Sequence, residues 1–266
     1  MRIARFTTGE DPQYGVVTGD VDDFGAPDEE AMIVALAGDP LYVGVQLTQE
    51  QHKFADVRLL APVIPRSKVV GIGRNYAAHA AELGNDVPAE PLMFLKPNTA
   101  VVGPRDPIFY PQQSNNVHYE GELAVVISRI CRDVTPDRVK DVIYGYTIGN
   151  DVTARDLQTS DVQFTRAKGF DSFCPLGPWI ETDLDTSDLS VQTYLNGDLM
   201  QDGSTKDMIF DVAALVAYVS SVMTLLPGDV ILTGTPDGVG PMNPGDEVDV
   251  TISGIGTLTN KVVARD

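Results

Sequence analysis

The chain has 266 residues, of which 43% are hydrophobic and 21% are charged, as is ordinary for a globular protein that buries a sizeable core. Its 38 acidic residues outnumber 19 basic ones, so that the formal net charge is −19 at pH 7. Such a field repels nucleic acid and anionic lipid, which excludes nucleic-acid binding as the expected function. It would also repel an anionic substrate, so any cation in a cleft is of interest.

The cysteines and the beginning of the sequence bear on location. Cys131 and Cys174 have neither the spacing of a metal site nor the density of a disulfide scaffold, which favours a reducing compartment. Cys174 is a candidate nucleophile, although a lone cysteine is more often a buried small hydrophobe. Residues 1–6 lack the apolar region of a signal peptide, and no segment has the unbroken apolar length of a membrane helix. We therefore expect a cytoplasmic protein.

Residues 1–63 are predicted to form a small N-terminal module. Strands are expected near residues 2–7 and 14–18, followed by a turn-rich acidic stretch over 19–30. The apolar spacing over 30–38 predicts a helix that ends at a glycine, and His52 is predicted to be a surface histidine. Two prolines within residues 61–66 indicate a linker, so residues 64–266 form the larger predicted unit.

A candidate general-base pair follows the first strand of the larger unit. Residues 68–73 are predicted to be a strand, and residues 77–83 a helix that ends at Gly84. In that helix His79 and Glu82 share a face, so the carboxylate can orient the imidazole. A merely solvated helix face is the alternative. The Gly71-x-Gly73 spacing lacks the third glycine of a dinucleotide-binding loop and is a weak signal.

Two carboxylates precede a strand that is apolar throughout. After short strands at 92–96 and 108–110, Glu120 and Glu122 are predicted to point the same way, with Gly121 leaving room between them. A third acid, Asp151, follows a strand-like run over 142–149. An oxygen-only set of this kind suits Mg²⁺, Mn²⁺ or Ca²⁺ better than zinc. The alternative is a solvated strand edge.

The rest of the chain alternates short strands with few helices, which favours a β-rich core. A loop over 164–171 carries Lys168, which by itself is expected on the surface. Asn196-Gly197 predicts a type I′ hairpin turn, and residues 209–219 predict a buried helix. A strand at 230–232 leads into a glycine-rich loop, where Thr235 and backbone amides either cradle an anion or simply form a turn.

Taken in order, these segments resemble the fumarylacetoacetate hydrolase family from about residue 68 to the end. The segments are Gly71-Ile72-Gly73-Arg74-Asn75-Tyr76 with His79 and Glu82, Phe94-Leu95-Lys96-Pro97, Glu120-x-Glu122-Leu123, Asn150-Asp151-x-Thr153-Ala154-Arg155-Asp156, Ala167-Lys168-x-Phe170-Asp171-x-x-Cys174-Pro175 and Leu232-Thr233-Gly234-Thr235-Pro236-x-Gly238-Val239-Gly240. The likeness is nearest to the small acylpyruvase and oxaloacetate decarboxylase members. The N-terminal module matches only loosely.

The resemblance implies a β-rich α+β fold, with a mixed β-sandwich roll, and a homodimer. It implies Mg²⁺ or Mn²⁺, with Ca²⁺ also possible, held by Glu120, Glu122 and Asp151. His79 and Glu82 would lie on a mobile lid helix, and Lys168 would be the active-site lysine. Arg74, Gln158 and Thr235 match positions that contact the substrate.

The implied reaction is metal-dependent cleavage of a carbon–carbon bond in a small anionic 2-oxo acid. Acylpyruvates such as fumarylpyruvate and acetylpyruvate would be hydrolysed, or oxaloacetate decarboxylated, through a metal-bound enolate. One alternative is isomerisation of 2-hydroxyhepta-2,4-diene-1,7-dioate, which relocates a proton without attack by water. Another is a metal-stabilised binding protein without turnover. The sequence leaves the physiological substrate and the ion open.

Overall fold

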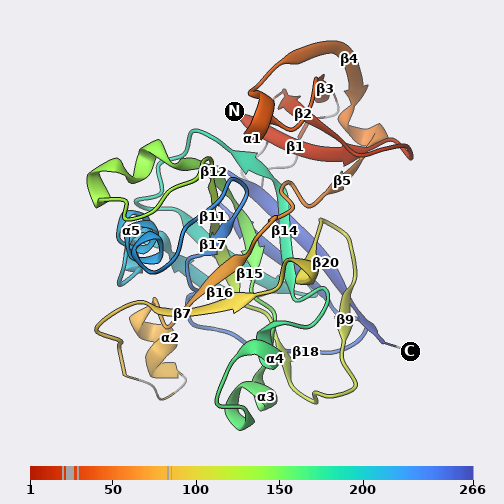
Figure 1. Ribbon diagram of the computed structural model, residues 1–266. Coiled ribbons are helices and arrows are strands. Elements are labelled where there is room, and N and C mark those ends of the chain that lie inside the picture. Colours follow the sequence, from red (N-terminus) through yellow and green to blue (C-terminus); the bar gives the residue numbers. More distant parts are fainter. Residues whose placement is uncertain (20, 22–26, 29, 83, 85, 266) are drawn as a thin grey trace.

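The computed structural model describes residues 1–19, 21, 27–28, 30–82, 84 and 86–265. Strands dominate and the helices are short, as the sequence predicts for a β-rich chain (Figure 1). Among these residues no helix is long and apolar enough to cross a membrane. The turn-rich stretch predicted over 19–30 falls largely outside the described residues.

A large mixed sheet runs through the molecule. In the described part of the chain it has 12 strands, with the main order β4-β3-β2-β1-β14-β12-β11-β17-β6-β7, while β5 pairs with β1 and β8 with β14. Pairing is antiparallel except for β17 with β6 and β14 with β8. The strands are β1 (Arg2–Thr7), β2 (Gln13–Thr18), β3 (Met32–Leu36), β4 (Leu47–Lys53), β5 (Arg58–Leu60), β6 (Val69–Gly73), β7 (Leu92–Lys96), β8 (Val101–Val102), β11 (Gly121–Ile127), β12 (Ile143–Asn150), β14 (Cys174–Glu181) and β17 (Val230–Leu232).

Two smaller sheets complete the strand layers. One has the order β16-β15-β19-β20-β9, and the other the order β13-β10-β18. Their strands are β9 (Ile108–Tyr110), β10 (Val117–His118), β13 (Thr153–Ala154), β15 (Ser190–Leu195), β16 (Asp198–Ser204), β18 (Pro241–Met242), β19 (Glu247–Ile252) and β20 (Gly256–Ala264). The hairpin between β15 and β16 turns at Asn196 and Gly197, whose φ angles of 54° and 88° confirm the predicted type I′ turn.

The helices lie at the periphery of the sheets. They are α1 (Pro40–Val43), α2 (Ala77–Glu82), α3 (Arg155–Ser160), α4 (Thr165–Lys168) and α5 (Val212–Val222), with 3₁₀ turns at Phe54–Asp56, Asn98–Ala100, Pro136–Asp141 and Thr205–Asp207. The helix predicted from residue 209 begins at Val212, because the Asp211 carboxylate caps it by accepting the Ala214 N–H at 2.8 Å.

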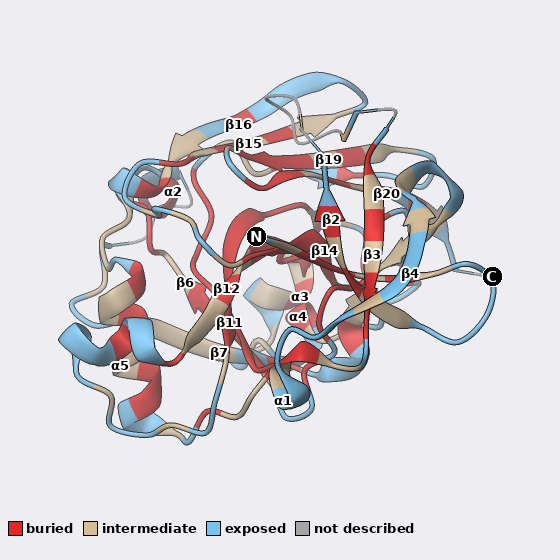
Figure 2. Cartoon of the chain, turned by 90° about the horizontal axis from the view of Figure 1, so that it is seen from above, coloured by how far each residue is buried: buried red, intermediate tan, exposed pale blue. Residues whose placement is uncertain are grey.

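Strand β11 lies in the middle of the core. Leu123 and Val125 pack with Val191 of β15 and with α5, whereas Ala124 and Val126 pack on the other face with Val230 and Leu232. Figure 2 shows β11 as a buried segment near the centre of the molecule. A strand buried on both faces has a continuous apolar sequence, which explains the unbroken run after the two glutamates.

The prediction of a helix over residues 30–38 is wrong. Residues Met32–Leu36 form β3, which pairs on one side with β2 and on the other with β4. Ile33 and Ala35 are buried while Met32 and Val34 are only partly buried, which is the alternation of a strand. A short apolar run fits both periods, and the two neighbouring strands decide between them.

Candidate active site

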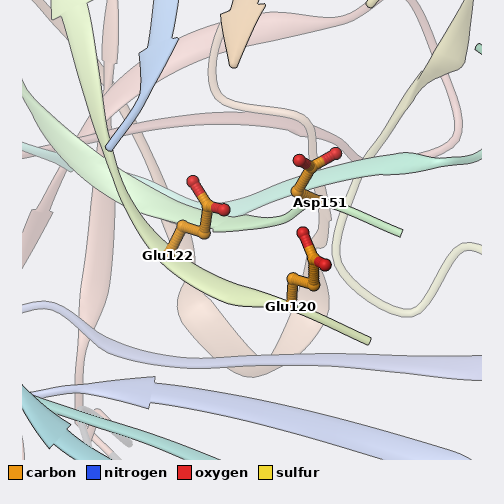
Figure 3. Close-up of side chains that lie close together, drawn as sticks. All are labelled: Glu120, Glu122 and Asp151. Carbon is orange, nitrogen blue, oxygen red and sulfur yellow. The ribbon is translucent and has the colours of Figure 1, made fainter. Parts of the chain in front are cut away.

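Three buried carboxylates meet where two neighbouring strands end. In the antiparallel pair β11–β12, Gly121 is opposite Asn150, which brings Glu120, just before β11, beside Asp151, just after β12. The Asp151 N–H donates to the Glu120 carbonyl at 2.9 Å. One carboxylate oxygen each from Glu120, Glu122 and Asp151 lies within 4.8 Å of the other two. Figure 3 shows the three carboxylates directed to the same side of the two strands.

Glu122 carries the electrostatic signature of a cation site. Its side chain accepts a hydrogen bond from the Gly234 N–H at 2.7 Å, and no basic side chain of the described residues forms an ion pair with it. Burial, followed by the charges of Asp151 and Glu120, raises the pKa of Glu122 well above its ordinary value. A divalent cation would relieve this repulsion, and the all-oxygen donor set is the kind that Mg²⁺ and Mn²⁺ prefer. The residues therefore fit such an ion.

Glu120 is stabilised as an anion by two basic side chains. Arg155 Nη2 donates to Glu120 Oε1 at 2.5 Å, and Lys168 Nζ donates to Oε2 at 2.8 Å. Burial by itself raises the pKa of Glu120, but the charges of Lys168 and Arg155 outweigh it and hold the pKa below its usual range. Glu120 is thus ionised throughout the neutral range.

Two buried lysines contact Asp151. Lys168 Nζ donates to Asp151 Oδ2 at 2.5 Å, and Lys96 Nζ donates to Oδ1 and, at 3.1 Å, to the Val152 carbonyl. Burial lowers the pKa of Lys168, but Asp151 and Glu120 outweigh it and raise that pKa above its usual value. Lys168 is therefore a buried cation at the end of α4, and not the surface side chain in a loop that its segment alone predicts.

Lys96 and Arg155 are functional-site residues that the sequence reasoning did not assign. Both stand inside the motif segments, and each neutralises one carboxylate of the cluster. Lys96 carries a detectable signal, because a lysine that ends an apolar strand needs a buried anion as partner. Arg155 has no comparable signal, since its partner Glu120 lies 35 positions away and is reached only through the strand pairing.

The predicted His79–Glu82 pair forms on α2. His79 Nδ1 lies 3.3 Å from Glu82 Oε2, and His79 is 5% exposed. The Glu82 carboxylate also accepts the Gly238 N–H at 3.1 Å, which ties α2 to the glycine-rich loop. Donation from Nδ1 to Glu82 leaves Nε2 of the neutral imidazole as a proton acceptor.

A cavity of about 410 Å³ brings most of the predicted site residues together. Glu82 and Asp151 do not line it, but they are hydrogen-bonded to His79 and Lys168, which do. The predicted residues that line it are Arg74, His79, Glu120, Glu122, Gln158, Lys168 and Thr235. Gln158 Oε1 accepts from Arg155 at 2.6 Å. The Thr235 hydroxyl donates to the Gly121 carbonyl at 2.9 Å and accepts from Gln201 at 2.7 Å.

Gly121 is required by packing on the face opposite the carboxylates, and not by the space between them. A Cβ at this position would collide with Thr193 Oγ1 and lie 2.8 Å from Val250 Cγ1, both in the five-stranded sheet. We expect Gly121→Ala to lower the free energy of unfolding by about 1–3 kcal/mol, as overpacking does. Guanidinium unfolding would measure it, with Gly38→Ala as control because an added Cβ there would meet only Val43 Cγ2, at 3.3 Å, on an exposed side chain that can shift. A stability equal to that of the control would contradict this assignment.

Cys174 is a buried core residue and not a nucleophile. Its side chain packs in the cluster of Leu176 and Ala124, and burial raises the pKa of the thiol to about 12. The thiolate, which is the nucleophilic form, is therefore scarce at neutral pH.

Comparison with known proteins places these residues in a family context. A family model described as fumarylacetoacetate (FAA) hydrolase C-terminal matches residues 68–263, and one described as Rv2993c-like, N-terminal, matches residues 1–62. The chain is 50% identical to Protein Rv2993c of Mycobacterium tuberculosis, covering 100% of this chain and 99% of that one. It is 43% identical to the mitochondrial oxaloacetate decarboxylase of Dictyostelium discoideum (71% of this chain, 90% of the relative). It is equally identical, at 43%, to the oxaloacetate tautomerase YcgM of Escherichia coli (75% and 94%).

Solved structures give the same fold. A 5-carboxymethyl-2-hydroxymuconate delta-isomerase from Mycobacterium smegmatis is 49% identical, with a TM-score of 0.91 and 100% of both chains covered. A fumarylpyruvate hydrolase from Pseudomonas aeruginosa, solved in complex with Mn²⁺ and pyruvate, is 34% identical with a TM-score of 0.72, covering 78% of this chain and 92% of that one. These likenesses confirm the predicted β-rich fold with a small N-terminal domain.

Proposed function

The chain belongs to the fumarylacetoacetate hydrolase family, and from this premise we propose that it is a Mg²⁺- or Mn²⁺-dependent enzyme that breaks a carbon–carbon bond of a 2-oxo acid. The substrates we propose are acylpyruvates such as fumarylpyruvate and acetylpyruvate, with decarboxylation of oxaloacetate as a second reaction of the same site. Relatives named for acting on oxo acids support this substrate class. The division at residue 63, the homodimer and the cytoplasmic location stay predictions.

One observation carries the proposal. The three carboxylates, the His79–Glu82 pair and Lys168 come from separate segments and meet at one cavity. A divalent ion held by Glu120, Glu122 and Asp151 would supply Lewis-acid polarisation of the vicinal carboxylate and carbonyl oxygens of a 2-oxo acid. A purely structural ion would need no histidine directed into the same cavity.

For hydrolysis, His79 is the general base. Its Nδ1–H bond to Glu82 orients the ring, so that Nε2 takes a proton from a water molecule that attacks the distal carbonyl of an acylpyruvate. The bond between that carbonyl carbon and the neighbouring methylene carbon then breaks. The products are a carboxylic acid and the enolate of pyruvate, which takes up a proton to become pyruvate.

For decarboxylation of oxaloacetate no attacking water is required. The bond between the methylene carbon and the distal carboxylate breaks, carbon dioxide leaves, and the electron pair remains as the enolate of pyruvate. Lys168 serves both reactions, because a buried cation beside Glu120 and Asp151 offsets the negative charge that develops on the substrate.

Proton relocation is a second candidate, favoured by the names of the isomerase and tautomerase relatives. In that reaction His79 would take a proton from one carbon of the substrate and return one elsewhere, with no bond to water formed. The 2-hydroxyhepta-2,4-diene-1,7-dioate isomerisation belongs to this class. The carboxylate cluster and the histidine have the same roles in both, so the product decides between them.

Product analysis tests the proposal. The protein with Mg²⁺ or Mn²⁺ should release pyruvate from acetylpyruvate, fumarylpyruvate or oxaloacetate, measured by mass spectrometry of the products. An isomer of unchanged mass would instead support the proton-relocation reaction. Binding of oxalate without turnover of any of these acids would show a binding protein and refute the enzymatic proposal.

A further inference from the structure

Arg74 lies in the cavity with a backbone conformation that its residue type rarely adopts. Its φ angle is 58°, in the left-handed region that disfavours side chains with a Cβ. Such conformations persist where the surrounding structure over-determines them, and they cluster at functional sites. Arg74 directly follows β6 and lies three residues before α2, which carries His79, so it belongs to the α2 side of the cavity.

The neighbouring Asn75 holds this backbone in place. Asn75 is fully buried, and its side chain donates to the carbonyls of Phe210 (2.9 Å) and Thr233 (2.8 Å). Its Oδ1 accepts the Phe210 N–H at 2.8 Å, and its own carbonyl accepts the Ile209 N–H at 2.8 Å. Hydrogen bonds of Asn75 therefore hold the backbone turn at Arg74 against the segments that contain Phe210 and Thr233. This fixes the backbone from which the Arg74 side chain enters the cavity wall.

Arg74 differs from the other cations of the site in having no anionic partner among the residues that the structure describes. Lys96, Lys168 and Arg155 each pair with Glu120 or Asp151. Arg74 forms no hydrogen bond or ion pair with any described residue, although it lines the cavity and is only partly exposed. Its guanidinium forms no ion pair with Glu120 or Asp151, whose partners are other basic side chains, nor with Glu122.

Part of the cavity wall is apolar. Leu92, Phe94 and Phe164 line the same cavity, and the two phenyl rings pack edge to face with their centroids 5.9 Å apart. A ligand that fits this arrangement has an oxygen-rich end for the ion, a carbon chain for the apolar wall, and a second anion for the free guanidinium. Arginine is the side chain that best matches a carboxylate, through two parallel hydrogen bonds.

On the basis of the proposed function, we propose that Arg74 binds a second carboxylate of the substrate, and that the site therefore prefers 2-oxo dicarboxylates to 2-oxo monocarboxylates of equal chain length. Arg74 is then the residue that determines this specificity. A ligand with a methyl group where the second carboxylate would be leaves the Arg74 guanidinium unpaired and partly desolvated, which disfavours binding of that ligand.

Matched ligand pairs test this without requiring turnover. Dissociation constants would be measured by calorimetry on the Mn²⁺-loaded protein for 2-oxoglutarate against 2-oxopentanoate, and for 2-oxoadipate against 2-oxohexanoate, because neither proposed reaction cleaves these acids. Each pair differs only in a terminal carboxylate or methyl group. We expect the wild type to bind at least one dicarboxylate more tightly, and Arg74→Gln to lose about 10- to 100-fold for that dicarboxylate with little change for its partner.

Two further variants separate specificity from folding. Arg74→Lys should recover part of the dicarboxylate affinity, because it keeps the charge but not the paired geometry. Arg105→Gln is the matched control, since Arg105 is also an arginine at positive φ (64°) but is exposed and outside the cavity. Oxalate has no carbon chain or distal carboxylate beyond the oxygens that chelate an ion, so we expect its affinity to be unchanged in Arg74→Gln.

The outcomes are distinct for the two proposals. Equal losses for both members of each pair, or no loss for either dicarboxylate, would overturn the role of Arg74. Selective binding that disappears in Arg74→Gln would support it even in a protein that releases no pyruvate from acetylpyruvate, fumarylpyruvate or oxaloacetate, and in that case only the proposed reaction would fail.

Discussion

Replacing Glu122 by glutamine is expected to abolish tight binding of Mn²⁺ and to lower kcat/KM on 2-oxo acids by about a hundredfold or more. Glutamine keeps the shape of the side chain and the oxygen that accepts the Gly234 N–H at 2.7 Å. It removes the one carboxylate of the cluster that pairs with no basic residue among those described. Titration calorimetry with Mn²⁺ and steady-state kinetics would measure both effects, and treatment of the wild type with EDTA should reproduce the loss of activity.

The same substitution should change stability in opposite directions with and without metal. The folded-state pKa of Glu122 is raised, so its contribution to stability falls as the pH rises from the ordinary glutamate pKa through the raised value. Metal-free Glu122→Gln should therefore melt above the wild type, with a difference that is larger near pH 8 than near pH 5. Saturating Mn²⁺ should reverse the order, because only the wild type gains stability from binding.

Glu247→Gln is the control for this substitution. Glu247 lies on β19 and its side chain is 44% exposed, so both its melting temperature and its response to Mn²⁺ should equal those of the wild type. Undiminished Mn²⁺ affinity in Glu122→Gln would remove Glu122 from the proposed ligand set. A metal-free variant that melts below the wild type at every pH would contradict the repulsion inferred at this side chain.

Replacing His79 by alanine is expected to slow hydrolysis of acylpyruvates by about 10²- to 10⁴-fold, the range that one general base contributes. Decarboxylation of oxaloacetate should fall less, since it needs no activated water. His79 does not belong to the carboxylate cluster, so Mn²⁺ affinity should stay unchanged. Single-turnover rates for both substrates and Mn²⁺ calorimetry on the same preparation would separate these effects.

Two companion variants sharpen the test of His79. Glu82→Gln keeps a hydrogen-bond acceptor for His79 Nδ1 but loses its charge, and we expect a smaller loss than for His79→Ala. His52→Gln is the control, because His52 contacts Glu50 and the Phe6 ring in the N-terminal strands and does not line the cavity. Hydrolysis at the full wild-type rate in His79→Ala would exclude the histidine as the base.

The sequence predicted the positions of the carboxylates because strand geometry is local. Alternate residues of an extended segment point the same way, so the spacing of Glu120 and Glu122 was sufficient to place both at one side (Figure 3). The spacing of His79 and Glu82 was sufficient to place both on one face of a helix, because residues three apart in a helix are neighbours on its surface. The cavity itself was not predictable from spacing, since its walls come from segments far apart in the chain.

Local patterns failed where they fit more than one structure. The apolar run that forms β3 satisfied a helical spacing, and only the neighbouring β2 and β4 selected the strand. Lys168 carries no local sign of burial, because the anions that compensate its charge, Glu120 and Asp151, lie 48 and 17 positions away. Composition assigns a lone lysine to the surface unless its partners are known.

The sequence by itself determined the family resemblance, the β-rich class and the donor chemistry, because these depend on residue types and on short-range periodicity. The tertiary structure alone decided which cations neutralise which carboxylates, and that Arg74 has no anionic partner within the described part of the chain. The physical reason is that electrostatic pairing acts across space and not along the chain. Lys96 and Asp151 are separated by 55 positions, and they meet only because β7, β11 and β12 belong to the same sheet.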